Sequence, residues 1–153
     1  MSREQIPLDL LSRWINLLIK DLGESVEEGT KQKILEKCGN VCSHYHGHVE
    51  KIRDIKRKAK SLDKILDIMN QEEMWCGKWI KERNIIYSKC NKVCGCPLVV
   101  SGIIKLSPTH CYCSHGYMKS IFGEILEKPF EVELEKSIGR GDDICLYTVK
   151  FDS

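Results

Sequence analysis

The first half of the chain repeats apolar residues at helical spacing. Leucine and isoleucine recur every three or four positions over residues 9–22, which is the period of an amphipathic helix. We expect this helix to end at Gly23, because glycine is typical of helix ends. A second helix is expected over residues 25–39, since Ser25 and Glu28 have the spacing of a capping box.

A third helical stretch follows Gly47. Its apolar positions, from Ile52 to Met69, are again spaced by three and four residues and form a heptad-like seam. Ser61 is expected to divide the stretch into two helices, because a serine side chain competes for backbone hydrogen bonds. The seam is shorter than three full heptads, so we interpret it as core packing rather than as a coiled-coil partner site.

The second half of the chain has the composition of strands. Residues 79–87 predict two short strands around a polar turn, and the apolar, β-branched residues 98–106 predict a buried strand. Residues 114–128 predict a helix that Pro129 ends. The remaining expected elements are two strands and the turn between them, at residues 130–134, 144–151 and 139–143.

This order of elements predicts an α+β fold, with N-terminal helices packed on an antiparallel sheet that one helix crosses. The length of 153 residues suits a single domain over residues 1–153. Within it we distinguish a helical part, residues 1–70, from a cysteine-rich sheet-plus-helix part, residues 75–153.

Charge and hydropathy narrow the possible partners. A net charge of +2 does not favour nucleic-acid binding. The most basic stretch, residues 51–60, is interpreted as a solvated helix face because its charges alternate with Ile52 and Ile55. No apolar run approaches the roughly 18 residues of a membrane span, and the N-terminus has no signal-peptide pattern. We therefore expect a cytoplasmic protein that binds neither nucleic acid nor membrane.

Nine cysteines are the strongest chemical signal in the sequence. A reducing cytosol disfavours disulfides, and an odd number of cysteines cannot pair completely within one chain. Thiolates suit zinc ions and iron–sulfur clusters, and the sequence leaves open which of the two is bound. We predict that four thiolates bind the metal, drawn from three local groups of cysteines: Cys38, Cys42, Cys90, Cys94, Cys96, Cys111 and Cys113.

The remaining cysteines and the histidines allow more than one interpretation. Cys76 and Cys145 are isolated, and we interpret them as small buried hydrophobic residues. The expected helix start should lower the pKa values of the Cys111 and Cys113 thiols. His110 and His115 flank this region and are candidates for a metal ligand or for a general base to a thiol. The other histidines are interpreted as exposed or capping residues: His44, His46 and His48.

Residues 111–151 resemble the end of the four-vinyl reductase domain. The matching features are Gly116-Tyr117 in a helix, Lys128-Pro129 at a turn, and Gly141 followed four residues later by Cys145 in the last strand. The sequence is also similar to the related aminothiazoline-carboxylate hydrolase-like proteins. It is most similar to the uncharacterised cysteine-rich bacterial and archaeal members of this superfamily.

The resemblance implies helices packed on an antiparallel sheet, a small-molecule pocket between them and, often, a homodimer. Some sensor relatives bind zinc at four positions. The outer two correspond here to Cys111 or Cys113 and to Cys145. The middle two correspond to Leu134 and Ser137, which bind zinc poorly. By this comparison, any metal would use the additional cysteines.

Two functions follow from these observations. The first is a metal-thiolate domain, with zinc or an iron–sulfur cluster, that binds or senses a small-molecule ligand. The alternative is a hydrolase or reductase-like enzyme that uses the metal or a low-pKa cysteine such as Cys113. The sequence has no phosphate loop, dinucleotide fingerprint or nucleophile elbow that would identify catalytic residues.

Overall fold

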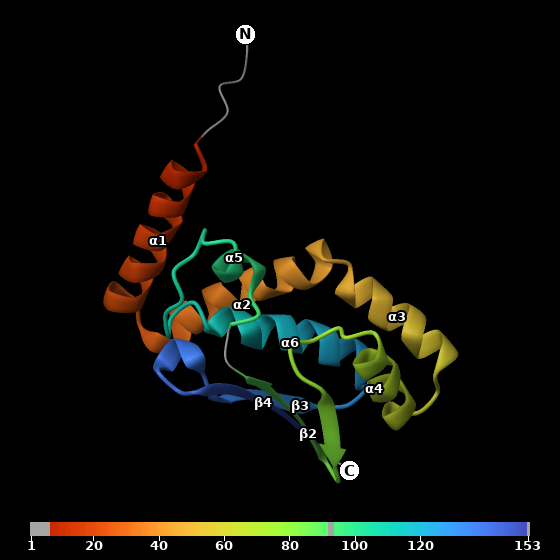
Figure 1. The fold of residues 1–153 in the computed structure, drawn as a ribbon. Coiled ribbons are helices and arrows are strands. Elements are labelled where there is room, and N and C mark those ends of the chain that lie inside the picture. Colours follow the sequence, from red (N-terminus) through yellow and green to blue (C-terminus); the bar gives the residue numbers. More distant parts are fainter. Residues whose placement is uncertain (1–6, 92–93, 153) are drawn as a thin grey trace.

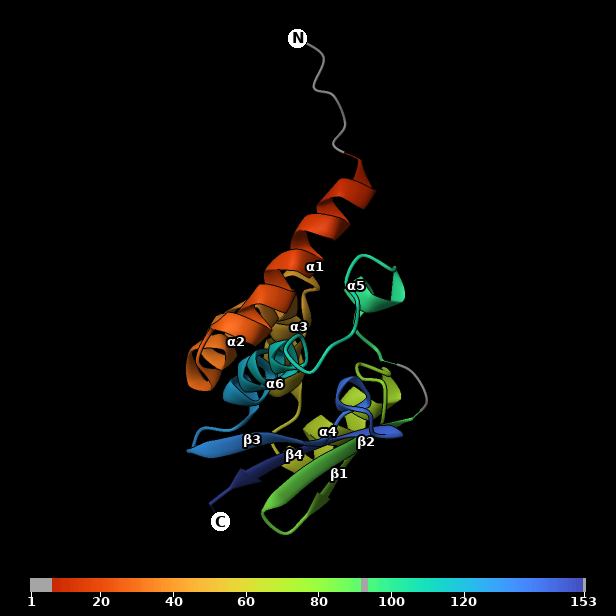
Figure 2. The same ribbon diagram turned by 90° about the vertical axis from the view of Figure 1, so that its left-hand side faces the viewer.

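The fold was analysed in a computed structural model that describes residues 7–91 and 94–152. Within these residues, four strands form one antiparallel sheet in the order β1-β2-β4-β3. The helices α2, α3 and α6 lie on one side of this sheet (Figures 1 and 2). The expected α+β fold is therefore confirmed. The strands are β1 (Trp79–Glu82), β2 (Ile85–Asn91), β3 (Phe130–Lys136) and β4 (Ile144–Phe151).

Helices make up most of the remaining described chain. Among them, none has the combination of length and apolarity that crossing a bilayer requires. Their bounds are α1 (Leu8–Ser25), α2 (Glu28–Tyr45), α3 (His48–Lys58), α4 (Leu62–Gln71), α5 (Pro97–Val100) and α6 (Tyr112–Ile125), with a short 3-10 helix at Ile138–Arg140.

The two glycines that were expected to end the N-terminal helices lie inside them. Gly23 belongs to α1 and Gly39 to α2, so both predicted helix ends are wrong. A Cβ atom at Gly39 would overlap the backbone carbonyl oxygen of Cys113 in α6. The residue is therefore required for close helix packing rather than for ending a helix. The cap of α2 is Glu27, whose carboxylate accepts two backbone N–H groups.

The heptad-like seam forms two core helices, as expected. Ser61 caps α4, because its hydroxyl oxygen accepts the backbone N–H of Lys64 at 3.3 Å. The apolar residues of the seam are buried against the sheet and α6, which confirms their interpretation as core. They include Ile52, Ile55, Ile65, Leu66 and Met69.

The predicted strand over residues 98–106 is wrong. Pro97 starts the short helix α5 instead, and the chain continues as a loop. The hydrogen bonds of this loop are made with α1, where Ser12 and Asn16 donate to the carbonyl oxygen of Ile103. Because α1 supplies partners for the loop backbone, the segment does not need a neighbouring strand.

Candidate functional site

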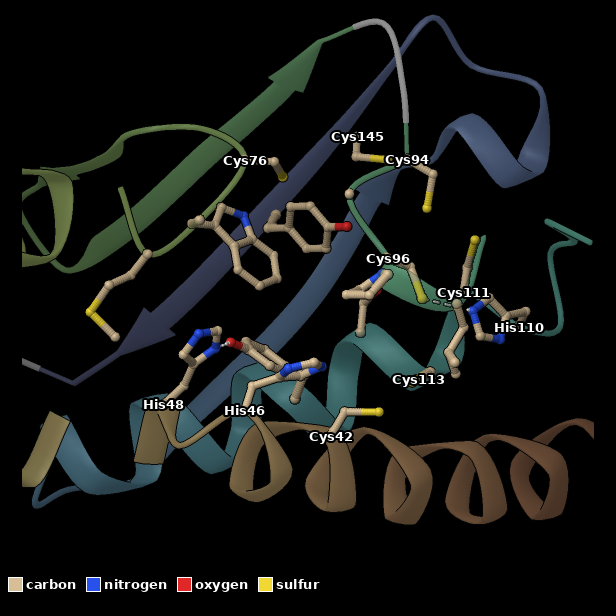
Figure 3. Close-up of a pocket in the computed structure, with 18 of the residues that line it drawn as sticks. Cys42, His46, His48, Cys76, Cys94, Cys96, His110, Cys111, Cys113 and Cys145 are labelled. Carbon is tan, nitrogen blue, oxygen red and sulfur yellow. Dashed lines mark hydrogen bonds between the residues drawn. The ribbon is translucent and has the colours of Figure 1, made fainter. Parts of the chain in front are cut away.

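A pocket of about 430 Å³ lies beside α2, α6 and the inner face of the sheet. All nine cysteines fall in the described part of the chain, and seven of them are free thiols. Six of those seven line the pocket and come from four separate segments of the chain (Figure 3). They are Cys42 from α2, Cys94 and Cys96 from the loop after β2, Cys111 and Cys113 at the start of α6, and Cys145 from β4.

Two of the seven predicted metal ligands lie elsewhere. Cys38 is exposed on α2 and does not line the pocket. Cys90 is bonded to Cys76, with 5.3 Å between their Cα atoms, so its place in the predicted thiolate set is wrong. One disulfide is therefore present, although the sequence analysis disfavoured disulfides. The pairing follows from the β1–β2 hairpin, because its register of Trp79 opposite Ser88 brings the residues just before β1 beside the end of β2.

The two cysteines that were expected to be core residues differ from each other. Cys145 is buried, with 6% of its surface exposed, and its side chain also reaches the pocket. Cys76 is exposed at the pocket edge, so its interpretation as a buried hydrophobic residue is wrong. The exposed Cys76 is bonded to Cys90, which is buried.

Burial weakens the acidity of several of the pocket thiols. It raises the pKa of Cys113 strongly, and the neighbouring Cys42 thiol adds to this effect. Burial also raises the pKa values of Cys94 and Cys111. The expected lowering at Cys113 by the helix start is therefore wrong, because desolvation of the thiolate outweighs the helix dipole. These thiols stay protonated at neutral pH until a cation or a base removes the proton.

One thiol lies beside a possible base. The Cys96 sulfur is 3.4 Å from the Nε2 atom of His110. Burial lowers the pKa of His110, so its imidazole is neutral at physiological pH and can accept a proton. Its Nδ1 atom is buried and has no hydrogen-bond partner among the described residues. The sequence placed His110 next to Cys111, whereas the structure pairs it with a cysteine from another loop.

Two further cysteines of the pocket contact the segment that precedes β4. The Cys111 sulfur is 3.1 Å from the Ser137 hydroxyl oxygen, and the Cys145 sulfur accepts the N–H of Ile138 at 3.4 Å. Over residues 7–91 and 94–152, however, no three histidine, cysteine or carboxylate side chains are arranged to hold a metal ion. Metal binding would therefore require the thiol side chains to turn toward one another.

Aromatic side chains form another part of the pocket wall. The Trp75 ring lies 5.2 Å from the rings of both Tyr117 and Tyr147, measured between centroids. The indole nitrogen of Trp75 is buried without a hydrogen-bond partner in the described structure. His48 makes a hydrogen bond to the Tyr117 hydroxyl at one end of this wall. Sequence reasoning did not identify these residues, because nothing in their spacing connects residues 75, 117 and 147.

Comparisons with known proteins give a family and a fold. A family described as "Family of unknown function (DUF6144)" matches residues 7–152, and no curated protein matches the sequence. Trafficking protein particle complex subunit 3 from Naegleria fowleri, solved covalently bound to palmitic acid, has a TM-score of 0.53 and 14% identity over 95% of both chains. A vinyl-4-reductase family protein from Methanocaldococcus jannaschii has a TM-score of 0.40 and 16% identity, over 99% of this chain and 85% of that one. The likeness to the trafficking subunit shows a shared fold.

Proposed function

The chain belongs to the DUF6144 family of unknown function, and we propose that it is a small-molecule-binding or sensing domain whose pocket holds a thiolate-bound metal. The observation that carries this proposal is the convergence of six free thiols, from four segments of the described chain, on one pocket. Structural cysteines scattered through a core would not share one accessible cavity.

The form of the pocket supports a bound ligand. Its volume lies within the range of about 300–1,000 Å³ that is typical of small-molecule sites. The Trp75, Tyr117 and Tyr147 rings offer an apolar surface, while the thiols and histidines that line the same pocket offer polar contacts. The fold is also able to hold a small molecule in another protein, since the trafficking subunit carries covalently bound palmitic acid.

The chemistry of the thiols favours a soft metal. Because burial raises the pKa values of Cys94, Cys111 and Cys113, these groups carry protons at neutral pH. A thiophilic cation displaces such protons and compensates the cost of a buried thiolate. Zinc could combine cysteine sulfur with the nitrogen of His110, whereas an iron–sulfur cluster would use four cysteines. Both metals remain part of the proposal.

The test is metal analysis of protein purified without oxygen. We expect a near-stoichiometric amount of zinc, or of iron together with acid-labile sulfide and a brown visible absorbance. Cys94→Ser and Cys113→Ser should each lower the metal content and the melting temperature. Cys38→Ser is the matched control, because Cys38 is exposed outside the pocket. A folded wild-type protein without metal would contradict the proposal.

A second candidate function is thiol-based catalysis, which the Cys96–His110 pair favours. In this case His110 takes the proton from Cys96, and the thiolate attacks a bound electrophile. Alkylation rates distinguish the two functions. One fast-reacting cysteine, Cys96, that becomes slow in His110→Gln would support the enzyme. Uniform protection of the pocket thiols that a chelator releases would support the metal domain.

A further inference from the structure

Cys90 is bonded to one cysteine and paired across the sheet with another. It forms a disulfide with Cys76, with 5.3 Å between the Cα atoms. It also lies directly opposite Cys145 in the ladder between β2 and β4. Opposite residues of antiparallel strands have Cα atoms about 4.5–5.5 Å apart and side chains on the same face. Disulfides form at Cα separations of about 4.4–6.8 Å, so both partners satisfy this requirement.

The environment of Cys145 suits a sulfur that attacks a disulfide. Its side chain lies on the inner face of the sheet, as does that of Cys90, and both residues are almost fully buried. The backbone N–H of Ile138 donates to the Cys145 sulfur at 3.4 Å. A hydrogen bond of this kind becomes stronger when the acceptor is negatively charged, so it assists the thiolate form during attack.

The environment of Cys76 suits the leaving group of a thiol–disulfide exchange. Cys76 is exposed and lines the pocket, where a released thiolate can be solvated. Its sulfur also lies against the turn at Gly95, between Cys94 and Cys96, since a Cβ atom at Gly95 would be 3.6 Å from it. Figure 3 shows Cys76, Cys145 and Cys94 together at one end of the pocket. The free and the bonded sulfurs therefore share one region.

We propose that Cys90 exchanges its disulfide partner between Cys76 and Cys145. The Cys145 thiolate attacks the Cys90 sulfur, and a Cys90–Cys145 bond forms as the Cys76–Cys90 bond breaks. Cys76 leaves as a thiolate and takes up the proton that Cys145 released. The step is neither a net oxidation nor a net reduction, because one disulfide and one thiol are present before and after it.

The exchange has two consequences for the pocket. A free thiol moves from Cys145, on the floor formed by β4, to Cys76, at the edge. The loop that carries Trp75 also loses its covalent link to β2, so one aromatic wall of the pocket becomes free to move. The exchange itself does not depend on metal binding. Only its effect on a ligand rests on the proposed function.

Disulfide mapping of the full-length, metal-free protein tests this exchange. The protein is equilibrated in a glutathione buffer, quenched with acid, alkylated and digested with trypsin. The three cysteines fall in separate tryptic peptides, residues 65–78, 90–92 and 141–150. In the wild type we expect peptide 90–92 linked to each of the other two. Cys145→Ser should retain only the link to 65–78, and Cys76→Ser only the link to 141–150.

The control variant changes a pocket thiol that takes no part in the exchange. Cys42→Ser removes a pocket thiol on α2, away from the strand pair, and should leave the ratio of the two links unchanged. The proposal is overturned if folded Cys76→Ser keeps Cys90 and Cys145 as free thiols, or links Cys90 to Cys94. If that variant does not fold, the wild-type map decides, and the absence of the 90–92/141–150 link overturns the proposal. Neither result depends on metal content.

Discussion

At the scale of single residues, burial changes the charge that several histidines can carry. Burial lowers the pKa values of His48, His110 and His115. His115 has a further reason to stay neutral, because its Nε2 atom accepts the backbone N–H of Leu134 at 3.2 Å. Protonation of that nitrogen would break the hydrogen bond and leave a buried N–H group without an acceptor.

These histidines predict a loss of stability in mild acid. Above the ordinary histidine pKa of about 6.5, both the folded and the unfolded chain are neutral at these sites. As the pH falls below this value, the unfolded chain binds protons first, so the free energy of unfolding decreases until the lowered native pKa is reached. We expect a decrease of up to about 1.4 kcal/mol per pH unit for each such histidine.

Urea unfolding between pH 7 and about pH 5 measures this effect, because the carboxyl groups titrate mainly below that range. His115→Gln removes one titrating group and should make the decrease shallower. His44→Gln changes an exposed histidine and should leave the decrease as it is in the wild type. Equal slopes in wild type and His115→Gln would contradict the assigned role of His115.

At the scale of secondary-structure elements, the crossing of α2 and α6 depends on two glycines. A Cβ atom at Gly39 would overlap the Cys113 carbonyl oxygen, and one at Gly116 would overlap the Glu36 carbonyl oxygen. Each glycine thus lets its helix approach the backbone of the other. This contact also places Cys42 of α2 beside Cys113 of α6, so the geometry of the thiol pocket depends on it.

Alanine substitutions test this crossing. Gly39→Ala and Gly116→Ala should each lower the free energy of unfolding by about 1–3 kcal/mol or more, because two backbones must separate. Gly123→Ala is the matched control in α6, since nothing lies within 4 Å of its added Cβ atom. It should be neutral or stabilising by up to about 1 kcal/mol, because alanine is the better helix former. Thermal or urea unfolding of the three variants gives the comparison.

At the scale of the whole molecule, α1 projects from the body (Figure 1), and several of its large apolar side chains are exposed. Ser12 and Asn16, on the opposite face, contact the loop after α5. Arg13 and Lys20 are outnumbered by acidic residues along α1, which argues against binding to an anionic membrane. The homodimer expected from the sequence resemblance would bury this exposed face of α1 against a second copy of the chain. The outward residues include Leu10, Trp14, Leu17 and Leu18.

The homodimer is tested by the molar mass in solution. We expect the wild type to have twice the chain mass of 17.6 kDa by light scattering. Trp14→Glu should yield a monomer, because it places a charge in the centre of the apolar face, where 65% of the Trp14 surface is exposed in the single chain. Lys20→Glu changes a charge beside that face and should remain dimeric. A monomeric wild type at high protein concentration would exclude this partner.

Local patterns determined most of the elements. The three-and-four spacing of apolar residues predicted α1, α3, α4 and α6, because helix periodicity is set by neighbouring residues. Ser61 divided α3 from α4 for an equally local reason, which is the hydrogen bond of its own cap. The strand predicted at residues 98–106 was wrong because its backbone partners lie on α1, more than eighty positions away in the chain.

For the candidate site too, the sequence predicted some features and the tertiary structure alone decided others. The number and grouping of cysteines predicted a place where thiols gather, and five of the seven named residues line one pocket. The bond of Cys90 to Cys76, the contact of Cys96 with His110 and the packing role of Gly39 were decided only by the tertiary structure. The Cys96–His110 and Gly39 contacts join segments that approach one another only in the packed fold, and a pattern along the chain carries no information about such distances. The Cys76–Cys90 bond depends instead on the exact register of the β1–β2 hairpin.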